Sequence, residues 1–267
     1  MKTKHLIPFV LVFAAVGIGV HHPKEASAEA KALGANQIVT RVLEADPWGL
    51  GGAEVKARAV VTDKNGKKRE LGFEAKSRRH AAPLSKSIIA FKSPADVAGM
   101  KFLQVQKEEG DDERFLYTPE LKRSRRIAGA NRSEAFMGTD FSYADLDRRD
   151  LRQGSANLKA DETLGKFDCY HVDVTPKNSD AIYSKIELWV RKDNLVPIKW
   201  NLFDKSGTNT KTLVAKELQR LGGKWFMTRS TMTDNQTSRT TELLLENIDP
   251  KEDIPLETFS VREIEKG

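Results

Sequence analysis

Apolar and polar residues alternate with a period of two along most of this chain. The first clear case is Ala53–Val61, where alanines and valines at every second position are separated mainly by charged residues. Successive side chains of a strand point to opposite faces of a sheet, so this pattern predicts a half-buried antiparallel strand. The Asn65-Gly66 pair that follows is a strong hairpin signal, and the alternation returns over Leu71–Ala75.

The same alternation recurs to the C-terminus, interrupted by short polar or glycine-containing turns. The further strands we expect are Lys86–Lys92, Met100–Lys107, Glu113–Tyr117, Lys122–Ile127, Ala156–Thr163, Asp168–Thr175, Tyr183–Arg191, Val196–Phe203, Lys211–Arg220, Lys224–Thr233 and Ser238–Asn247. Strands this closely spaced predict a meandering antiparallel sheet, and a sheet of more than about ten strands curls or closes. The expected fold class is therefore mostly β, in the α+β sense, with one large curled sheet.

Two segments depart from this alternation. Ala30–Ala45 has apolar residues at helical spacing and is followed by an Asp-Pro pair that ends the pattern. The segment from Ala128 to Arg149, called the lid insert below, shows no alternation and carries several aromatic residues. Ser142 and Asp145 have the spacing of a capping box, so a short helix is expected to begin there. We expect the lid insert to cover one face of the sheet, the alternative being a long loop with a small core of its own.

The N-terminus has the features of a signal peptide. A basic start with Lys2 and Lys4 precedes an apolar run over Leu6–Val20, and a polar stretch then ends in Ala26-Ser27-Ala28. The apolar run is short for a membrane span of about 20 residues, which disfavours the alternative of a retained anchor. We expect cleavage after Ala28, export to the periplasm, and a single domain over residues 29–267.

Charge and cysteine content narrow the possible partners. The predicted signal peptide holds three lysines and one glutamate, so its removal lowers the formal net charge from +6 to +4. A mildly basic exported protein is expected to meet anionic membrane surfaces or acidic partners rather than nucleic acid. Cys169 is the only cysteine, which excludes an internal disulfide and favours a buried, inert thiol.

The sequence lacks the motifs of common catalytic sites. It has no Gly-x-Ser-x-Gly, His-Glu-x-x-His, phosphate-loop or Gly-x-Gly-x-x-Gly pattern, so no enzymatic activity and no cofactor are expected. Cys169, His171 and Asp173 would share one face of a strand, and each residue type can bind a metal. Two-residue spacing on one strand does not make a closed tetrahedral set, so we expect an inert polar face and no metal site.

The run Lys122–Arg126 is a basic strand whose charges fall on both faces. An arginine that points inward needs a partner, because an unpaired buried charge is very costly. We therefore expect one basic residue of this strand to contact an acidic or carbonyl group of the lid insert. The pattern does not single out one of the basic residues.

Several motifs of the mature chain together are typical of a known family. The first is Phe136–Leu146 after a basic strand. The others are Val196-Pro197-Ile198, Asp204-Lys205-Ser206-Gly207, Lys211-Thr212-Leu213, Gly223-Lys224-Trp225 and Thr240-Thr241-Glu242-Leu243. With these motifs the mature chain as a whole resembles the outer-membrane lipoprotein-sorting family, the LolA-like periplasmic carriers. The resemblance implies an unclosed β-barrel with an N-terminal helix and helices over an apolar concave face. It also implies binding of lipid or lipoprotein acyl chains without a cofactor, and exchange between an inner-membrane transporter and an outer-membrane acceptor.

The alternating strands and the lid insert define the candidate site. The inward positions of the first three strands are expected to form the cavity wall: Val55, Ala57, Ala59, Leu71, Phe73, Ala75, Ile89 and Phe91. The lid is expected to contribute Phe136, Met137, Phe141, Tyr143 and Leu146. The favoured function is that of a monomeric carrier. Two alternatives stay open, a non-carrier accessory subunit of a lipid-exporting transporter and, ranked last, an enzyme acting on lipids or cell-wall glycans.

Overall fold

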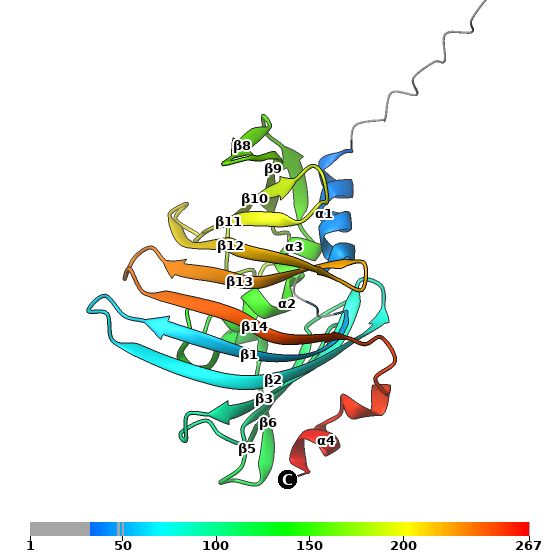
Figure 1. Cartoon of the computed structure of the whole chain (residues 1–267), viewed down its shortest axis with the longest axis vertical. Helices are drawn as coiled ribbons and strands as arrows, with labels where there is room; N and C mark the ends of the chain where they lie inside the picture. The colour runs from blue at the N-terminus through cyan, green and yellow to red at the C-terminus, as the bar shows by residue number, and fades with distance from the viewer. Residues whose placement is uncertain (1–32, 47–48, 50, 267) are drawn as a thin grey trace, which may run out of the picture. The chain divides into compact units, whose positions relative to one another are not determined.

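A 14-stranded antiparallel sheet dominates the computed structural model, which describes residues 33–46, 49 and 51–266 (Figure 1). The predicted signal peptide and its cleavage site lie outside the described residues. The first six strands are β1 (Gly52–Thr62), β2 (Lys68–Ala81), β3 (Leu84–Ser93), β4 (Lys101–Val105), β5 (Glu113–Thr118) and β6 (Arg123–Arg126). The others are β7 (Ser155–Leu158), β8 (Glu162–Leu164), β9 (Phe167–Thr175), β10 (Lys185–Arg191), β11 (Pro197–Phe203), β12 (Asn209–Leu221), β13 (Lys224–Asp234) and β14 (Thr240–Pro250).

The strand order shows two meanders joined at their first and last strands. β1 to β6 follow one another on one side, β14 back to β9 follow on the other, and β1 pairs with β14 in the middle. The two ends of the path are β6 and β7, and within the described residues no ladder joins them, so the sheet curls without closing. The fold class expected from the sequence, a mostly β protein with one large antiparallel sheet that curls into an unclosed barrel, is confirmed.

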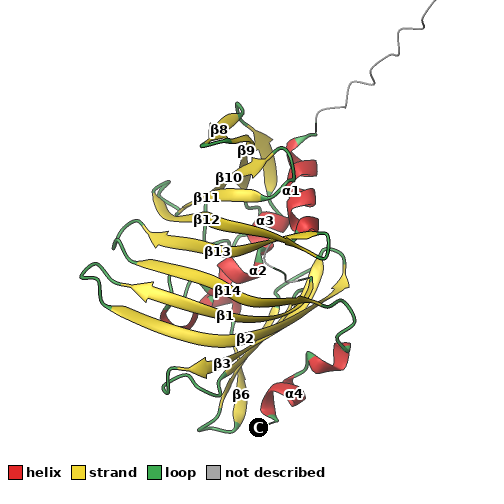
Figure 2. Cartoon of the chain, viewed as in Figure 1, coloured by secondary structure: helices red, strands yellow, loops and turns green. Residues whose placement is uncertain are grey.

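Short helices supplement the sheet (Figure 2). They are α1 (Ala35–Ala45), α2 (Tyr143–Asp147), α3 (Arg149–Arg152) and α4 (Val261–Glu265), with 3-10 turns at Gly129–Asn131, Phe136–Gly138 and Leu256–Thr258. The helix expected near the N-terminus is present from Ala35 onward. The helix expected at Ser142 is also present: the Ser142 hydroxyl accepts from the Asp145 N–H, and the Asp145 carboxylate accepts from the Ser142 N–H, as in a capping box.

Buried side chains gather on both faces of the sheet. The concave face holds one cluster between α1 and strands β9 to β13 and another between the early strands and the lid insert. Neighbouring residues of β4 show the two faces, because Phe102 packs toward the lid insert whereas Leu103 packs toward α4 residues such as Ile264. Among the described residues, no helix has the length and apolar composition needed to span a bilayer.

The structure corrects two details of the sequence analysis. The strand expected over Ala156–Thr163 is two strands, β7 and β8, separated by three residues. The arginines of β6 (Arg123, Arg125 and Arg126) are all exposed, so none of them is the inward charge that the sequence led us to expect. β6 lies at the end of the strand order with one hydrogen-bonded neighbour, β5, and its arginine side chains reach water there.

Candidate functional site

A cavity of about 120 Å³, the larger cavity, lies between the early strands, β14 and the lid insert. The predicted wall residues Val55, Ala59, Leu71, Phe73, Ala75, Ile89 and Phe91 all line it. Ala57 is the exception: it is buried but does not line the cavity. The ladder between β1 and β14 shifts register between Lys56 and Ala57, an irregularity that the alternation of β1 does not reveal.

The cross-strand register explains why space remains beside the wall. Ala75 lies opposite Val55 on β1 and opposite Ile89 on β3, so a small side chain stands between two branched ones. Phe73 and Phe91 are paired across β2 and β3, with ring centroids 5.8 Å apart. Small side chains beside large ones leave a void that no neighbouring side chain of the sheet fills.

Aromatic side chains of the lid insert close the cavity from the other side. The Phe136 ring lies 5.8 Å from Phe91 and 5.0 Å from Phe102, in edge contact with the latter. Tyr143 of α2 lies 5.6 Å from both Phe102 and Phe136. Aromatic pairs at these separations add attraction beyond the area they bury, so these contacts hold the insert against the sheet. Of the predicted lid residues, Phe136, Phe141 and Leu146 line the cavity, whereas Tyr143 and Met137 pack in the neighbouring cluster without lining it.

Some cavity residues lie outside the first three strands and outside the predicted lid residues. Leu243 and Leu245 of β14 line the cavity next to β1, where their Cα partners are Ala59 and Ala57. Leu243 and Leu245 are two residues apart in the predicted strand Ser238–Asn247, so the sequence indicates that they share one face of this strand. The sequence does not indicate that β14 pairs with β1. Arg148, which follows α2, also lines the cavity.

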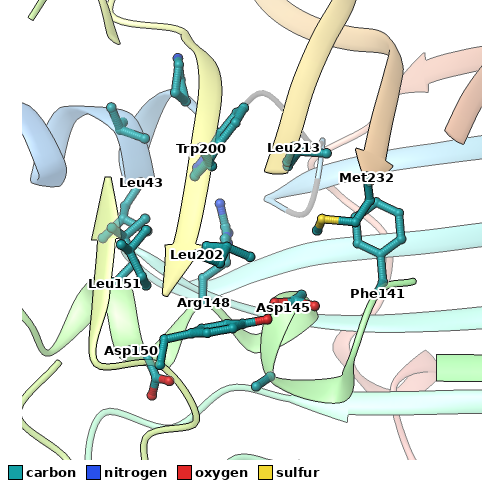
Figure 3. A pocket seen from close by; sticks show the side chains of 15 residues that line it. Leu43, Phe141, Asp145, Arg148, Asp150, Leu151, Trp200, Leu202, Leu213 and Met232 are labelled. Atoms are coloured by element: carbon teal, nitrogen blue, oxygen red, sulfur yellow. Dashed lines mark hydrogen bonds between the residues drawn. The ribbon is translucent and has the colours of Figure 1, made fainter. Parts of the chain in front are cut away.

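A second cavity of about 70 Å³, the smaller cavity, lies beside the first (Figure 3). Figure 3 shows Phe141 and Met232 at one end and Leu43 and Leu151 at the other. Phe141, Asp145 and Arg148 line both cavities. These three side chains therefore form a partition in which one apolar ring stands beside two charged groups.

Asp145 ties the lid insert to the second half of the sheet. Its carboxylate accepts hydrogen bonds from Tyr183 at 2.7 Å and from Lys211 of β12 at 3.0 Å. Burial of the Tyr183 phenol and the adjacent Asp145 carboxylate raise the pKa of Tyr183 well above its ordinary value of 10.0. The phenol therefore keeps its proton and remains a donor to Asp145.

A second attachment joins the lid insert to β14. The Asp140 carboxylate accepts from the Thr241 hydroxyl at 2.6 Å and from Arg239 at 2.9 Å, while its backbone N–H donates to the Thr241 hydroxyl at 2.8 Å. Thr241 is fully buried. Arg69 of β2 donates to the Met137 carbonyl at 3.0 Å. Arg69 and Arg239 thus anchor the lid insert to the sheet. From the sequence, we had expected a basic residue of β6 to have this role.

Arginines of the lid insert itself form a third attachment. Arg132, only 1% exposed, donates to Asp150 at 2.9 Å and lies 3.6 Å from Asp180. Arg149 pairs with Asp111 of the β4–β5 hairpin and with Asp180. Partial burial raises the pKa of Asp180, but the hydrogen bond and charge of Arg149 outweigh it, so this pKa lies below its ordinary 3.8.

The Cys169, His171 and Asp173 triplet lies on the other face of β9. Tyr170, Val172 and Val174, the alternate residues, pack into the concave core. Cys169 is buried, and this burial raises the pKa of its thiol above the ordinary 9.0, which keeps the group protonated. None of the three triplet residues lines either cavity.

Comparison with solved structures defines the class of protein. An outer membrane lipoprotein-sorting protein domain from Vibrio parahaemolyticus is 25% identical, with a TM-score of 0.81 and coverage of 87% of this chain and 98% of its own. A DUF1329 family protein from Desulfovibrio piger is 25% identical, with a TM-score of 0.77 and coverage of 84% and 95%. A LolA superfamily protein from Nitrosomonas europaea, 18% identical, has a TM-score of 0.70 over 86% of this chain and 98% of its own, and shares the fold. The fold is therefore LolA-like.

The family follows from the sequence. A family model described as an uncharacterized protein matches residues 84–266, and the chain belongs to that family, a LolA-like group of the DUF1329 kind. None of the curated proteins matches the chain. The larger cavity and the insert that covers it are therefore features of a LolA-like fold.

Proposed function

We propose that this protein is a periplasmic carrier that binds acyl chains of a lipid or lipoprotein in the larger cavity. The observation that carries the proposal is the mostly apolar lining of this cavity, closed by the aromatic side chains of the lid insert. Acyl chains entering such a site gain about 0.8 kcal/mol per buried CH₂ group. Contacts of this kind are non-directional, which allows cargo to leave as well as to enter.

The volume of the larger cavity indicates a closed state. Its 120 Å³ is of the size of an engineered apolar cavity of about 150 Å³ that accepts benzene. A complete acyl chain needs more room, and the lid insert is the segment whose displacement provides it. The smaller cavity of about 70 Å³ lies beyond Phe141 and would extend the site when this ring moves.

The proposal includes a location and partners. The signal-peptide features at the N-terminus support export with cleavage after Ala28. A carrier in the periplasm receives cargo from an inner-membrane transporter and delivers it to an outer-membrane acceptor, and we propose that it does so as a monomer. The proposal assigns no catalytic reaction and no cofactor to the protein.

Native mass spectrometry with lipid extraction tests this proposal directly. The protein is expressed with its own N-terminus, purified from the periplasm in a volatile buffer, and compared before and after delipidation. We expect the untreated protein to carry one or two lipid-sized masses, and the stripped protein to bind a fluorescent fatty acid that unlabelled lipid displaces. Stripped wild-type protein that binds no acyl chain would overturn the carrier proposal and favour the alternative of an accessory subunit, whose cavity stays closed.

A further inference from the structure

Four side chains with metal-ligand chemistry meet on the outer face of β8, β9 and β10. His171 and Asp173 lie two residues apart on β9, and Glu187 of β10 is the Cα partner of Asp173 across the ladder. One ligand atom from each of these three residues lies within 4.8 Å of the others. Their side chains are only 12%, 14% and 15% exposed. From the sequence we expected no metal site here because the candidate ligands all lay on one strand, β9, and the β9–β10 pairing supplies a further ligand.

Glu162 of β8 fixes the orientation of the His171 ring. Its carboxylate lies 2.9 Å from His171 Nδ1, and its second oxygen accepts from Trp189 Nε1 at 2.8 Å. Trp189 is also stacked on the His171 ring, with centroids 4.4 Å apart and planes 15° from parallel. A carboxylate that accepts from Nδ1 places the proton there and leaves Nε2 with a free lone pair, as in metal-binding histidines.

The lone pair of His171 Nε2 faces another acceptor. Asp173 Oδ1 lies 3.8 Å away, and neither atom has a hydrogen-bond partner in the described part of the chain, although both are shielded from solvent. Two shielded acceptors facing each other without a donor are unfavourable. A cation between them removes this cost, since zinc bonds of about 2.0–2.2 Å to each atom span a separation of this size.

We propose that His171 Nε2, Asp173 and Glu187 bind a zinc ion on this outer face, with water as the fourth ligand. One imidazole nitrogen and two carboxylates form a donor set that zinc accepts in tetrahedral geometry. Glu162 is a positioning residue that orients the imidazole without touching the ion. Because the ligands come from β9 and β10, the ion joins these neighbouring strands near the end of the sheet.

Two lysines and one asparagine contact the carboxylates of this site, and Asn201 donates to Glu187 Oε2 at 3.2 Å. Lys185 lies 2.7 Å from Glu187 Oε1, and Lys159 lies 3.4 Å from Asp173 Oδ2. Both lysine side chains are partly exposed, at 35% and 53%, so each can swing into water when the ion takes its share of the carboxylate. Asp173 Oδ1 is the oxygen that neither lysine contacts.

Calorimetric titration with zinc chloride tests the proposal on the mature protein, free of any affinity tag and treated with a chelator. We expect one zinc ion per chain for the wild type. Asp173→Asn and Glu187→Gln keep side-chain volume and are expected to weaken binding by about tenfold or more, and Glu162→Gln by about tenfold with stoichiometry unchanged. His80→Gln and Cys169→Ala, which alter the other described histidine and the neighbouring thiol, are matched controls expected to bind zinc as the wild type does.

The fluorescence of Trp189 gives a second measurement of metal binding, independent of calorimetry. Cobalt chloride placed in the same site should quench Trp189 fluorescence because the indole is stacked on His171, and zinc should reverse the quenching. Circular dichroism confirms that each variant is folded before titration. Absence of stoichiometric zinc binding to the wild type, or binding that Asp173→Asn and Glu187→Gln leave unchanged, would overturn the proposal. Neither result tests the proposed binding of acyl chains, because the zinc ligands do not line the cavities.

Discussion

Phe73 and Ala75 on β2 show how single side chains shape the larger cavity. They share one face of the strand, two residues apart, and both line the cavity. Phe73 packs its ring against Phe91, whereas Ala75 leaves space between Val55 and Ile89. A change of charge at the first position or of size at the second therefore acts directly on the space proposed for cargo.

Phe73→Glu is expected to lower affinity for a fluorescent fatty acid by more than about tenfold. A carboxylate inside an apolar cavity loses its hydration without gaining a partner, which costs several kcal/mol. Ala75→Phe should weaken binding as well, by filling the space without adding charge. Lys56→Glu is the control, since Lys56 is on the opposite face of β1 with 64% of its side chain exposed. Equal affinities for the inward and outward variants would contradict the assignment of the cavity.

Phe141→Ala should join the two cavities by removing the ring of their partition. Truncation of a buried phenylalanine costs about 3–5 kcal/mol of unfolding free energy, measured by denaturant titration. The same variant should gain affinity for long fatty acids relative to short ones, because the merged space is longer. Phe203→Ala is the matched control: this half-buried ring on β11 lines neither cavity, so chain-length preference should stay as in the wild type.

At the scale of elements, the lid insert is attached to several parts of the sheet. Asp140 binds β14, Asp145 binds β12, and Arg149 binds the β4–β5 hairpin and Asp180. Met137 has a φ angle of 52° and Gly138 one of 77°, so the backbone turns sharply where the insert leaves the aromatic cluster. In the proposed carrier, opening of the insert for cargo would break this defined set of polar contacts and leave the sheet intact.

Thr241→Val is expected to loosen the lid insert. It removes the hydroxyl that serves both the carboxylate and the backbone N–H of Asp140 while preserving side-chain shape, at a cost of about 1–3 kcal/mol. Hydrogen exchange over residues 136–147 should become faster, and fatty-acid exchange should accelerate. Thr240→Val, one residue earlier on β14 and without these bonds, should leave both rates unchanged. Unaltered exchange in Thr241→Val would show that this attachment does not hold the insert.

Acid should also loosen the insert, through Asp180. The pKa of Asp180 in the folded protein lies below its ordinary 3.8, so ionised Asp180 stabilises the fold at every pH above about 4. This contribution is lost as the pH falls from about 4 through the lowered folded-state pKa, where protonation breaks the pair with Arg149. Hydrogen exchange of the insert, followed from pH 5 to pH 3, should accelerate. Asp180→Asn should show faster exchange already at pH 5 and a weaker dependence on pH.

At the scale of the whole molecule, export is the step on which the proposed function depends. Cleavage after Ala28 predicts that N-terminal sequencing of the periplasmic protein begins at Glu29. Ala28→Leu should block processing, because signal peptidase requires a small side chain before the cut, whereas Glu29→Gln should be processed normally. A membrane-bound product that retains Met1 in the wild type would contradict this prediction.

Local regularities of the sequence predicted most of the fold. The two-residue period of Ala53–Val61 marks one apolar face, and burial of Ala53, Val55, Ala57, Ala59 and Val61 follows it. The Asn65-Gly66 turn and the capping box at Ser142 were also predictable, since each depends on contacts only a few residues apart. Local sequence therefore predicted the positions of most strands, of these turns and of the lid insert, with the division of Ala156–Thr163 into β7 and β8 as an exception.

Tertiary structure decided which distant residues meet, because strand pairing and packing join positions that no local pattern relates. The pairing of β1 with β14 brings Leu243 to the larger cavity, and the register of this pairing shifts between Lys56 and Ala57, the predicted wall residue that does not line it. Tertiary packing also brings Arg69 and Arg239, rather than the arginines of β6, into contact with the lid insert. The register between β9 and β10 likewise places Glu187 beside Asp173, a contact that the sequence of either strand by itself does not contain.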